Sequence, residues 1–256
     1  EAEPAGESTD WEIGWVWAFI DRPAAGFEVA ADFWCAATGT TLSPRRGEVD
    51  EFATFLPLIG DAHLKLQAIA GQCPGGHLDF EVTDVPAALA HAVDHGATRV
   101  ADLGTLQVLH SPAGLPFCLV PARESRARGP VAETEGGLIR ADQVAIDVGP
   151  SHAGREANFW TALTRWRRLG SVREEFTVIQ SPAELPVRLL VQRLQTEQPP
   201  RVHLDLACSD VAAATAYHQA LGASVVGRHL FWTTMSDPAG GLYCLTARDP
   251  HTGRLT

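Results

Sequence analysis

Hydrophobic and polar positions alternate in short runs along the first part of the chain, with one helical segment among them. Residues 15–21 predict a strand, and residues 27–38 predict an amphipathic helix that ends at Gly39. Runs at residues 51–58 and 62–70 have the composition and alternation of strands. The pattern therefore predicts a strand, a helix and then further strands.

The same order recurs in the next part of the chain. Residues 77–82 predict a strand, and Asp84 stands where it can cap a helix that ends at Gly96. Three apolar residues of this helix are expected to face the core: Val85, Leu89 and Val93. Three more strands are expected near residues 98–100, 104–110 and 116–121. Two βαβββ modules of this kind predict an α+β domain with an antiparallel-rich sheet.

The second half of the chain repeats the first at an offset of 126 residues. The His-Leu-Asp triplet at residues 77–79 recurs at residues 203–205, and 11 of the 24 positions in residues 77–100 are identical in residues 203–226. A constant offset indicates a tandem duplication, so we expect four modules in two domains. The expected organisation is a disordered segment (residues 1–13), domain 1 (14–121), a linker (122–140), domain 2 (141–249) and a tail (250–256).

Composition and charge narrow the functions that these domains can have. The 256 residues carry a formal charge of -11, and a net negative chain without a basic patch argues against binding nucleic acid. No apolar run approaches the roughly 20 residues that cross a bilayer, so we expect no membrane association. The first ten residues have no apolar core typical of a signal peptide, and the five cysteines form no CxxC pair. These features predict a cytoplasmic protein.

Taken together, the four modules and their shared residues resemble a known superfamily. The Phe-Trp pair near the start of each half, the His-Leu-Asp triplets and the run at residues 231–245 are similar to the glyoxalase/bleomycin resistance protein/dioxygenase (vicinal oxygen chelate) superfamily, in its glyoxalase-like bacterial branch. The resemblance covers residues 14–121 and 141–249. It implies that each pair of modules forms an open cup, or half-barrel, with the ligand or metal inside. A chain with four modules builds both cups itself, so a monomer or a homodimer is expected.

The resemblance also indicates where metal-dependent members place their ligands. Carried over to this chain, the four positions of the first cup are Trp17, Lys65, His77 and Cys118. Those of the second are Gln143, Val191, His203 and Cys244. A catalytic divalent ion needs at least three suitable ligands, which neither set supplies. We therefore predict no metal and no other cofactor. The alternative is a soft Cys-His zinc site that includes Asp79 or Asp205, but the cysteines fit better as small buried side chains.

Strand alternation places the polar side chains of residues 77–82 and 63–67 on the face that the resemblance assigns to the cup. A histidine beside a carboxylate is a plausible general base, so the candidates for proton transfer are His77, Asp79 and Glu81. The same His-Leu-Asp triplet also fits a purely structural role. The ligand-binding candidates in the first cup are Trp17, Phe19, His63, Lys65, Gln67 and Cys118. Those in the second cup are Gln143, Arg193, His203, Asp205, Trp232 and Cys244.

Three functions remain open at this point. The first is a metal-independent protein that binds a small, aromatic molecule in a cup. The second is a lyase, isomerase or dioxygenase with a metal held by His77 or His203. The third is a metal-free enzyme of secondary metabolism.

Overall fold

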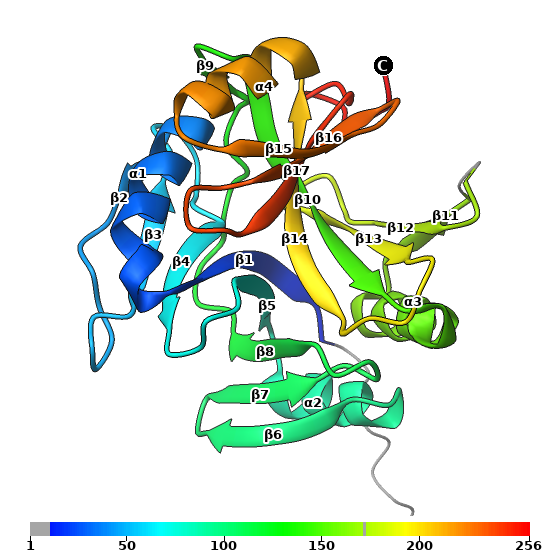
Figure 1. The fold of residues 1–256 in the computed structure, drawn as a ribbon. Helices are drawn as coiled ribbons and strands as arrows, with labels where there is room; N and C mark the ends of the chain where they lie inside the picture. Colours follow the sequence, from blue (N-terminus) through cyan, green and yellow to red (C-terminus); the bar gives the residue numbers. More distant parts are fainter. Residues whose placement is uncertain (1–10, 171–172) are drawn as a thin grey trace, which may run out of the picture.

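The computed structural model describes residues 11–170 and 173–256 and shows two sheets built from four modules (Figure 1). The first sheet contains β1 (Ile13–Pro23), β2 (Thr41–Leu42), β3 (Phe52–Leu56), β4 (Leu64–Ile69), β5 (Gly75–Val82), β6 (Thr98–Leu103), β7 (Leu106–His110) and β8 (Pro116–Pro121). Its helical segments are η1 (Ala24–Gly26), α1 (Phe27–Thr38) and α2 (Val85–Asp94). The predicted α+β fold with two half-barrel domains is confirmed.

The second sheet repeats this arrangement. It contains β9 (Ala132–Thr134), β10 (Gly137–Val148), β11 (Arg167–Leu169), β12 (Phe176–Gln180), β13 (Arg188–Arg193), β14 (Arg201–Cys208), β15 (Ser224–Arg228), β16 (Trp232–Ser236) and β17 (Leu242–Thr246). Its helices are α3 (Pro150–Thr164) and α4 (Val211–Ala220). None of the described helices combines the length and hydrophobicity that crossing a bilayer requires.

Both sheets have the same strand order. The first runs β2-β3-β4-β1-β5-β8-β7-β6 and the second β11-β12-β13-β10-β14-β17-β16-β15, with β9 added beside β10. The two modules of a domain meet where β1 pairs antiparallel with β5, and where β10 pairs antiparallel with β14. The longest strands of each sheet therefore form the floor of its cup.

Local sequence explains the helix ends. The backbone of Gly39 ends α1 in the left-handed region (φ 65°), which glycine adopts without strain. The Asp84 carboxylate accepts a hydrogen bond from the Ala87 N–H and caps α2. The predicted buried face of α2 was wrong in detail, because Val93 is 46% exposed while Ala88 and Ala92 are fully buried. Alanines one turn apart form the buried side of this helix.

The segment between the domains is partly structured. β9 lies within the stretch predicted as a linker and pairs antiparallel with β10, which begins at Gly137. At the other end of the chain, Trp11 is buried, so the described structure starts with a core residue. The rest of the predicted disordered segment, residues 1–10, lies outside the described residues.

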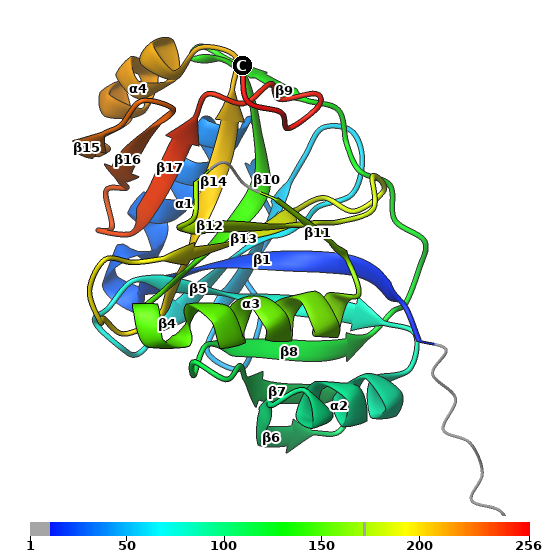
Figure 2. The ribbon, with the colours of Figure 1, turned by 90° about the vertical axis from the view of Figure 1, so that its right-hand side faces the viewer.

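Helices α1 and α3 join the two domains. Each lies against its own sheet and also contacts the other domain, and α3 runs beside β8 in Figure 2. Trp34 of α1 packs edge-on against Tyr243 of β17, with ring centroids 5.1 Å apart. Trp160 of α3 packs against Phe117 of β8 at 5.3 Å. These reciprocal aromatic contacts create one continuous core across the domain boundary.

A buried carboxylate lies beside the first of these contacts. Asp237 accepts hydrogen bonds from the Arg22 guanidinium of domain 1 (2.6 and 2.8 Å) and from the Trp34 indole (2.9 Å). Its second oxygen accepts the N–H groups of Ala239 and Gly241. Gly241 is required here, because a Cβ at this position would overlap the Arg22 guanidinium. The carboxylate therefore fixes a strand and a helix of domain 1 against a turn of domain 2.

We predict that Asp237→Asn lowers the free energy of unfolding by about 3–5 kcal/mol, because it leaves the buried Arg22 charge without its partner. The matched control is Asp102→Asn, which removes an exposed carboxylate 3.4 Å from Arg99 and should change stability much less, because solvent screens the exposed pair. Urea denaturation measures both. Equal effects of the two substitutions would contradict this role of Asp237.

A second prediction concerns His218, which is fully buried and hydrogen-bonded to the Tyr243 hydroxyl at 2.8 Å. Burial lowers the pKa of His218 to about 4. As pH falls from about 6.5, the unfolded chain binds a proton that the folded chain does not, so stability decreases toward pH 4. The difference in unfolding free energy between wild type and His218→Gln should therefore shrink over this range. A difference that stays constant between about pH 6.5 and pH 4 would contradict it.

Candidate functional site

The second cup encloses a cavity of about 180 Å³. Polar side chains at one side come from the central strands, and apolar side chains form the walls. The residues that line it include Gln143, Phe176, Val178, Arg188, Leu190, Gln192, His203, Asp205, Phe231, Trp232, Cys244, Thr246 and Arg248. The Phe176 and Trp232 rings meet edge to face at 5.8 Å and form an aromatic wall.

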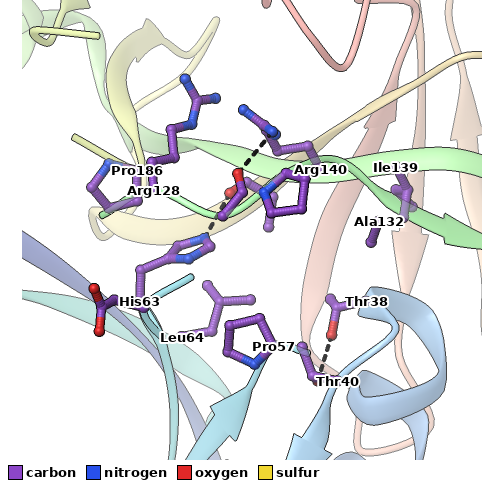
Figure 3. Close-up of a pocket in the computed structure, with 14 residues that line it drawn as sticks. Thr38, Thr40, Pro57, His63, Leu64, Arg128, Ala132, Ile139, Arg140 and Pro186 are labelled. Atoms are coloured by element: carbon purple, nitrogen blue, oxygen red, sulfur yellow. Dashed lines mark hydrogen bonds between the residues drawn. The ribbon is translucent and has the colours of Figure 1, made fainter. Parts of the chain in front are cut away.

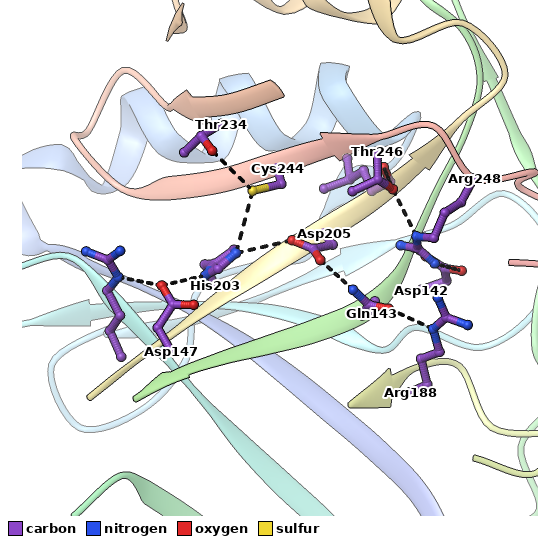
Figure 4. A network of polar contacts seen from close by, with 12 residues as sticks. Asp142, Gln143, Asp147, Arg188, His203, Asp205, Thr234, Cys244, Thr246 and Arg248 are labelled. Carbon is purple, nitrogen blue, oxygen red and sulfur yellow. Dashed lines mark hydrogen bonds and ion pairs between the residues drawn. The ribbon is translucent and has the colours of Figure 1, made fainter. Parts of the chain in front are cut away.

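Three donor atoms converge on the polar side of this cavity (Figure 4). His203 and Asp205 are two residues apart on β14 and so share a face, while the parallel pairing of β14 with β17 places Cys244 beside Asp205. The His203 Nε2 atom lies 3.2 Å from Asp205 Oδ1 and 3.6 Å from Cys244 Sγ. All three donor atoms lie within 4.8 Å of one another. The structure therefore unites three residues that the sequence had placed in the second cup.

A further carboxylate lies behind the histidine. Asp147 Oδ2 is 3.6 Å from His203 Nδ1 and accepts a hydrogen bond from Arg201 at 2.8 Å. Burial alone would lower the pKa of His203, but Cys244 and Asp205 outweigh burial and raise it well above its usual value. Burial alone would raise the pKa of Asp205, but the hydrogen bond with His203 and the charges of His203 and Arg248 together outweigh burial and lower the pKa. The two side chains thus favour a charged pair.

This donor set fits a zinc-type ion. Zinc binds sulfur, nitrogen and oxygen ligands at about 2.0–2.3 Å, so neighbouring ligands of a tetrahedral ion lie roughly 3.3–3.6 Å apart. The distances of 3.2 and 3.6 Å from His203 agree with this spacing. In addition, Asp205 Oδ1 is buried and has no partner other than His203 Nε2 among the described residues. The same three residues formed the soft-metal alternative in the sequence analysis.

The cavity also contains a cation that the sequence analysis missed. Arg188 donates from Nε to Gln143 Oε1 at 2.7 Å, and Gln143 in turn donates to Asp205 at 2.5 Å. Its neighbour Arg248 is held by both oxygens of Asp142, at 2.7 and 2.8 Å. Among the described residues no carboxylate forms an ion pair with Arg188. Burial, and then the charge of Arg248, lower the pKa of Arg188 to about 10.

Strand register explains why Arg188 was missed. Residues 188, 190 and 192 share one face of β13, whereas the offset of 126 assigns residues 191 and 193 to the cup. The first sheet pairs Phe19 with Lys65, whereas the second pairs the equivalent Ala145 with Leu190. The repeat offset is therefore 125 in this strand, not 126. Leu190, and not the expected Val191, is the counterpart of Lys65; it lines the cavity, while Val191 lies in the core. Aligning the Leu-Lys-Leu-Gln sequence at residues 64–67 with the Leu-Leu-Val-Gln sequence at residues 189–192 would have found this shift.

The same shift changes the assignment of Arg193. Gln192, the counterpart of Gln67, lines the cavity, whereas Arg193 is exposed and borders an adjacent hollow beside Trp232 and His229. The structure thus places Arg193 outside the cavity of the second cup. The other five residues expected there do line it: Gln143, His203, Asp205, Trp232 and Cys244.

The interior of the first cup is filled by its own side chains. The Lys65 ammonium lies over the Trp17 ring at 4.1 Å and the Phe19 ring at 4.9 Å. Glu81 accepts a hydrogen bond from the Trp17 indole at 2.8 Å and forms an ion pair with Arg126 at 3.0 Å. Arg126 belongs to the segment after β8 and also stacks over Trp17 at 4.8 Å. Glu81 is therefore already bonded on both sides.

The histidine of the first cup has a different partner from the expected one. His77 Nδ1 is hydrogen-bonded to Asp21 at 2.8 Å, while its Nε2 atom lies 3.8 Å from Asp79. Burial lowers the pKa of His77, but the hydrogen bond to Asp21 and the negative charges of Asp21 and Asp79 together outweigh burial and raise it. Asp79 is buried beside Cys118, and burial raises the pKa values of both groups. Asp21 matches Asp147 at the repeat offset, a correspondence that could have identified both carboxylates.

Two other candidates were expected in the first cup, His63 and Gln67. His63 precedes β4, and its Nε2 donates to the Ala141 carbonyl of domain 2 at 2.9 Å. The structure therefore places His63 at the boundary between the domains instead of in the cup. Gln67 is half-buried on β4, paired in register with Asp21 of β1 and Phe52 of β3.

Comparison with known proteins agrees with the fold. The model of a glyoxalase-like domain family matches residues 17–120 and again residues 143–246. The chain is similar to the Mn(II)-bound glyoxalase from Novosphingobium aromaticivorans (15% identity, TM-score 0.66, covering 96% of this chain and 87% of that chain). It is also similar to a variant of homoprotocatechuate 2,3-dioxygenase from B. fuscum in complex with HPCA (14% identity, TM-score 0.62, covering 98% of this chain and 75% of that chain).

A third similar structure is a variant of 4-hydroxymandelate synthase from Streptomyces coelicolor (15% identity, TM-score 0.59, covering 93% of this chain and 94% of that chain). At these identities the similarity concerns the fold alone. A comparison with curated proteins gives no significant match.

Proposed function

Because the chain belongs to the family of glyoxalase-like domains, we propose that its second cup binds a small aromatic molecule that carries a negative charge, a carboxylate being the simplest. The observation that carries this proposal is Arg188, a cation without an ion-pair partner among the described residues, in a cavity with an aromatic wall.

The two cups differ in the space they leave. Where the first cup has Trp17 and Phe19, the second has Gln143 and Ala145. Exchanging two large rings for smaller side chains opens the second cup, while Arg126 closes the first. We therefore assign binding to the second cup.

The cavity has a suitable size and lining for one aromatic ring. A dry cavity of about 150 Å³ is enough to hold benzene in an engineered protein, and this one measures about 180 Å³. Phe176 and Trp232 supply ring faces and edges against which a planar molecule packs. The related dioxygenase fold accommodates HPCA in its complex, which supports a small ligand in this kind of cup.

Arg188 supplies the charged end of the site. Its Nε is used by Gln143 and its Nη1 makes a long contact of 3.4 Å to Gln180, which leaves donors for a ligand. A guanidinium binds a carboxylate through two parallel hydrogen bonds, and burial strengthens such bonds. Gln143 holds Arg188 in place through its own bond to Asp205.

We predict that benzoate quenches or shifts Trp232 fluorescence in a saturable way and that Arg188→Gln weakens benzoate binding by about tenfold or more, as expected for a lost charge-assisted hydrogen bond. Benzamide, the neutral analogue, should bind both proteins equally. Arg193→Gln, on the same strand but outside the cavity, is the matched control and should leave benzoate binding unchanged. Equal losses for benzoate and benzamide would contradict the role of Arg188, and no saturable response to either would contradict aromatic binding in this cup.

A second candidate function is a metal-dependent lyase, isomerase or dioxygenase. The observation that favours it is the convergence of His203, Asp205 and Cys244 within 4.8 Å. A bound divalent ion would act there as a Lewis acid toward a ligand oxygen. Asp147 would then orient His203 from behind. The proton-transfer roles expected for His77, Asp79 and Glu81 in a metal-free enzyme stay predictions.

Metal analysis separates the two candidates. If the second holds, protein purified without chelators contains about one zinc-type ion per chain, and both His203→Gln and Cys244→Ala lose it. Cys118→Ala, the equivalent change in the first cup, should keep it. Protein without bound metal even after incubation with zinc would contradict the metal-dependent function while leaving the benzoate prediction intact.

A further inference from the structure

A second cavity, of about 80 Å³, lies where the two domains meet. Domain 1 contributes the end of α1 and the loop before β4, including Thr38 and His63. The segment between the domains contributes Arg128, and the start of β10 contributes Ile139 and Arg140 (Figure 3). The cavity is separate from both cups and from the donor set around His203.

Two arginines define the chemistry of this cavity. The side chains of Arg128 and Arg140 lie close together in Figure 3, and both are half-buried. Burial lowers the pKa of each, and the charge of Arg128 lowers that of Arg140 further. Holding two like charges together in a partly buried place costs free energy. A group of opposite charge is needed to offset this cost.

The described residues do not supply that group. Arg140 donates only to the Gly129 carbonyl, at 3.0 Å, and the Nε of Arg128 is buried without a hydrogen-bond partner. Asp142 acts on both arginines from a distance, but its two oxygens are bonded to Arg248. Asp61, at the edge of the cavity, accepts the N–H of Ala127 at 2.7 Å.

His63 does not provide a negative charge either. Burial lowers its pKa to about 4, and the two arginines lower it further, so the ring is neutral near pH 7. The remaining lining residues are mostly apolar, among them Leu64, Pro57 and Pro186. The cavity therefore presents two guanidinium groups that form no ion pair with a carboxylate among the described residues, in a chain whose net charge is -11.

We propose that this cavity binds a small inorganic oxyanion of the phosphate or sulfate class. Two guanidinium groups offer paired N–H donors that match the oxygens of a tetrahedral anion. The volume of about 80 Å³ exceeds the roughly 30 Å³ of one water molecule and suits an anion of a few atoms better than a nucleotide. The bound anion bridges the segment between the domains and the first strand of domain 2, and so stabilises the boundary.

Titration calorimetry with sodium phosphate, at an ionic strength held constant with sodium chloride, tests this proposal. We expect saturable binding of one phosphate per chain and a rise of the melting temperature with phosphate concentration. Both effects should be lost in Arg128→Gln and in Arg140→Gln. They should persist in Arg99→Gln, an exposed arginine with its own carboxylate partner.

Three results would overturn the proposal. Wild-type protein without saturable phosphate binding would do so whether or not the variants fold. Binding that survives both Arg128→Gln and Arg140→Gln would place the phosphate elsewhere, for example on Arg188. Tighter binding of phenyl phosphate than of inorganic phosphate would show that the site takes part of a larger molecule.

Discussion

The buried carboxylate of Asp237 is the interaction on which the arrangement of the two domains depends. It holds Arg22 and Trp34 of domain 1 on a turn of domain 2, and the two aromatic cores meet around it. At the pseudo-equivalent contact, Glu156 accepts the Trp160 indole and an N–H group of domain 1. In each contact, a buried carboxylate accepts a hydrogen bond from a tryptophan indole. The carboxylate comes from different elements, because Asp237 lies in a turn of domain 2 and Glu156 lies on α3 itself. The domains share one continuous core that carries two cups whose contents have diverged.

Divergence of the cups follows from a few large-to-small differences between otherwise equivalent positions. Trp17 and Phe19, together with Lys65 and Arg126, occupy the first cup and satisfy one another through cation–π contacts and the ion pair with Glu81. Smaller side chains at the equivalent positions leave the second cup open. Its polar side combines the His203 donor set with the Arg188 cation. Under the proposed function, the first cup serves as part of the scaffold, and the second provides the space and the charges for a ligand.

Much of the fold could be predicted from the sequence because the signals are local. Periodicity, the Asp84 cap, Gly39 and the repeat gave the helices, most strands and both domains. The candidate site was predicted less well. A one-residue register shift in β13 is compensated before β14, so the overall offset of 126 concealed it and put Arg193 where Gln192 lies. The position of His63 at the boundary between the domains and the pairing of His77 with Asp21 depend on contacts between distant segments. The alternation of residues along one strand does not reveal such contacts.

The most direct test of the account is a crystal structure of the protein with bound benzoate. We predict that the ring lies in the second cup beside Phe176 and Trp232, with its carboxylate within hydrogen-bond distance of the Arg188 guanidinium, while Arg126 still covers the first cup. Benzoate bound in the first cup with Arg126 displaced, or bound in the second cup with its carboxylate away from Arg188, would contradict it.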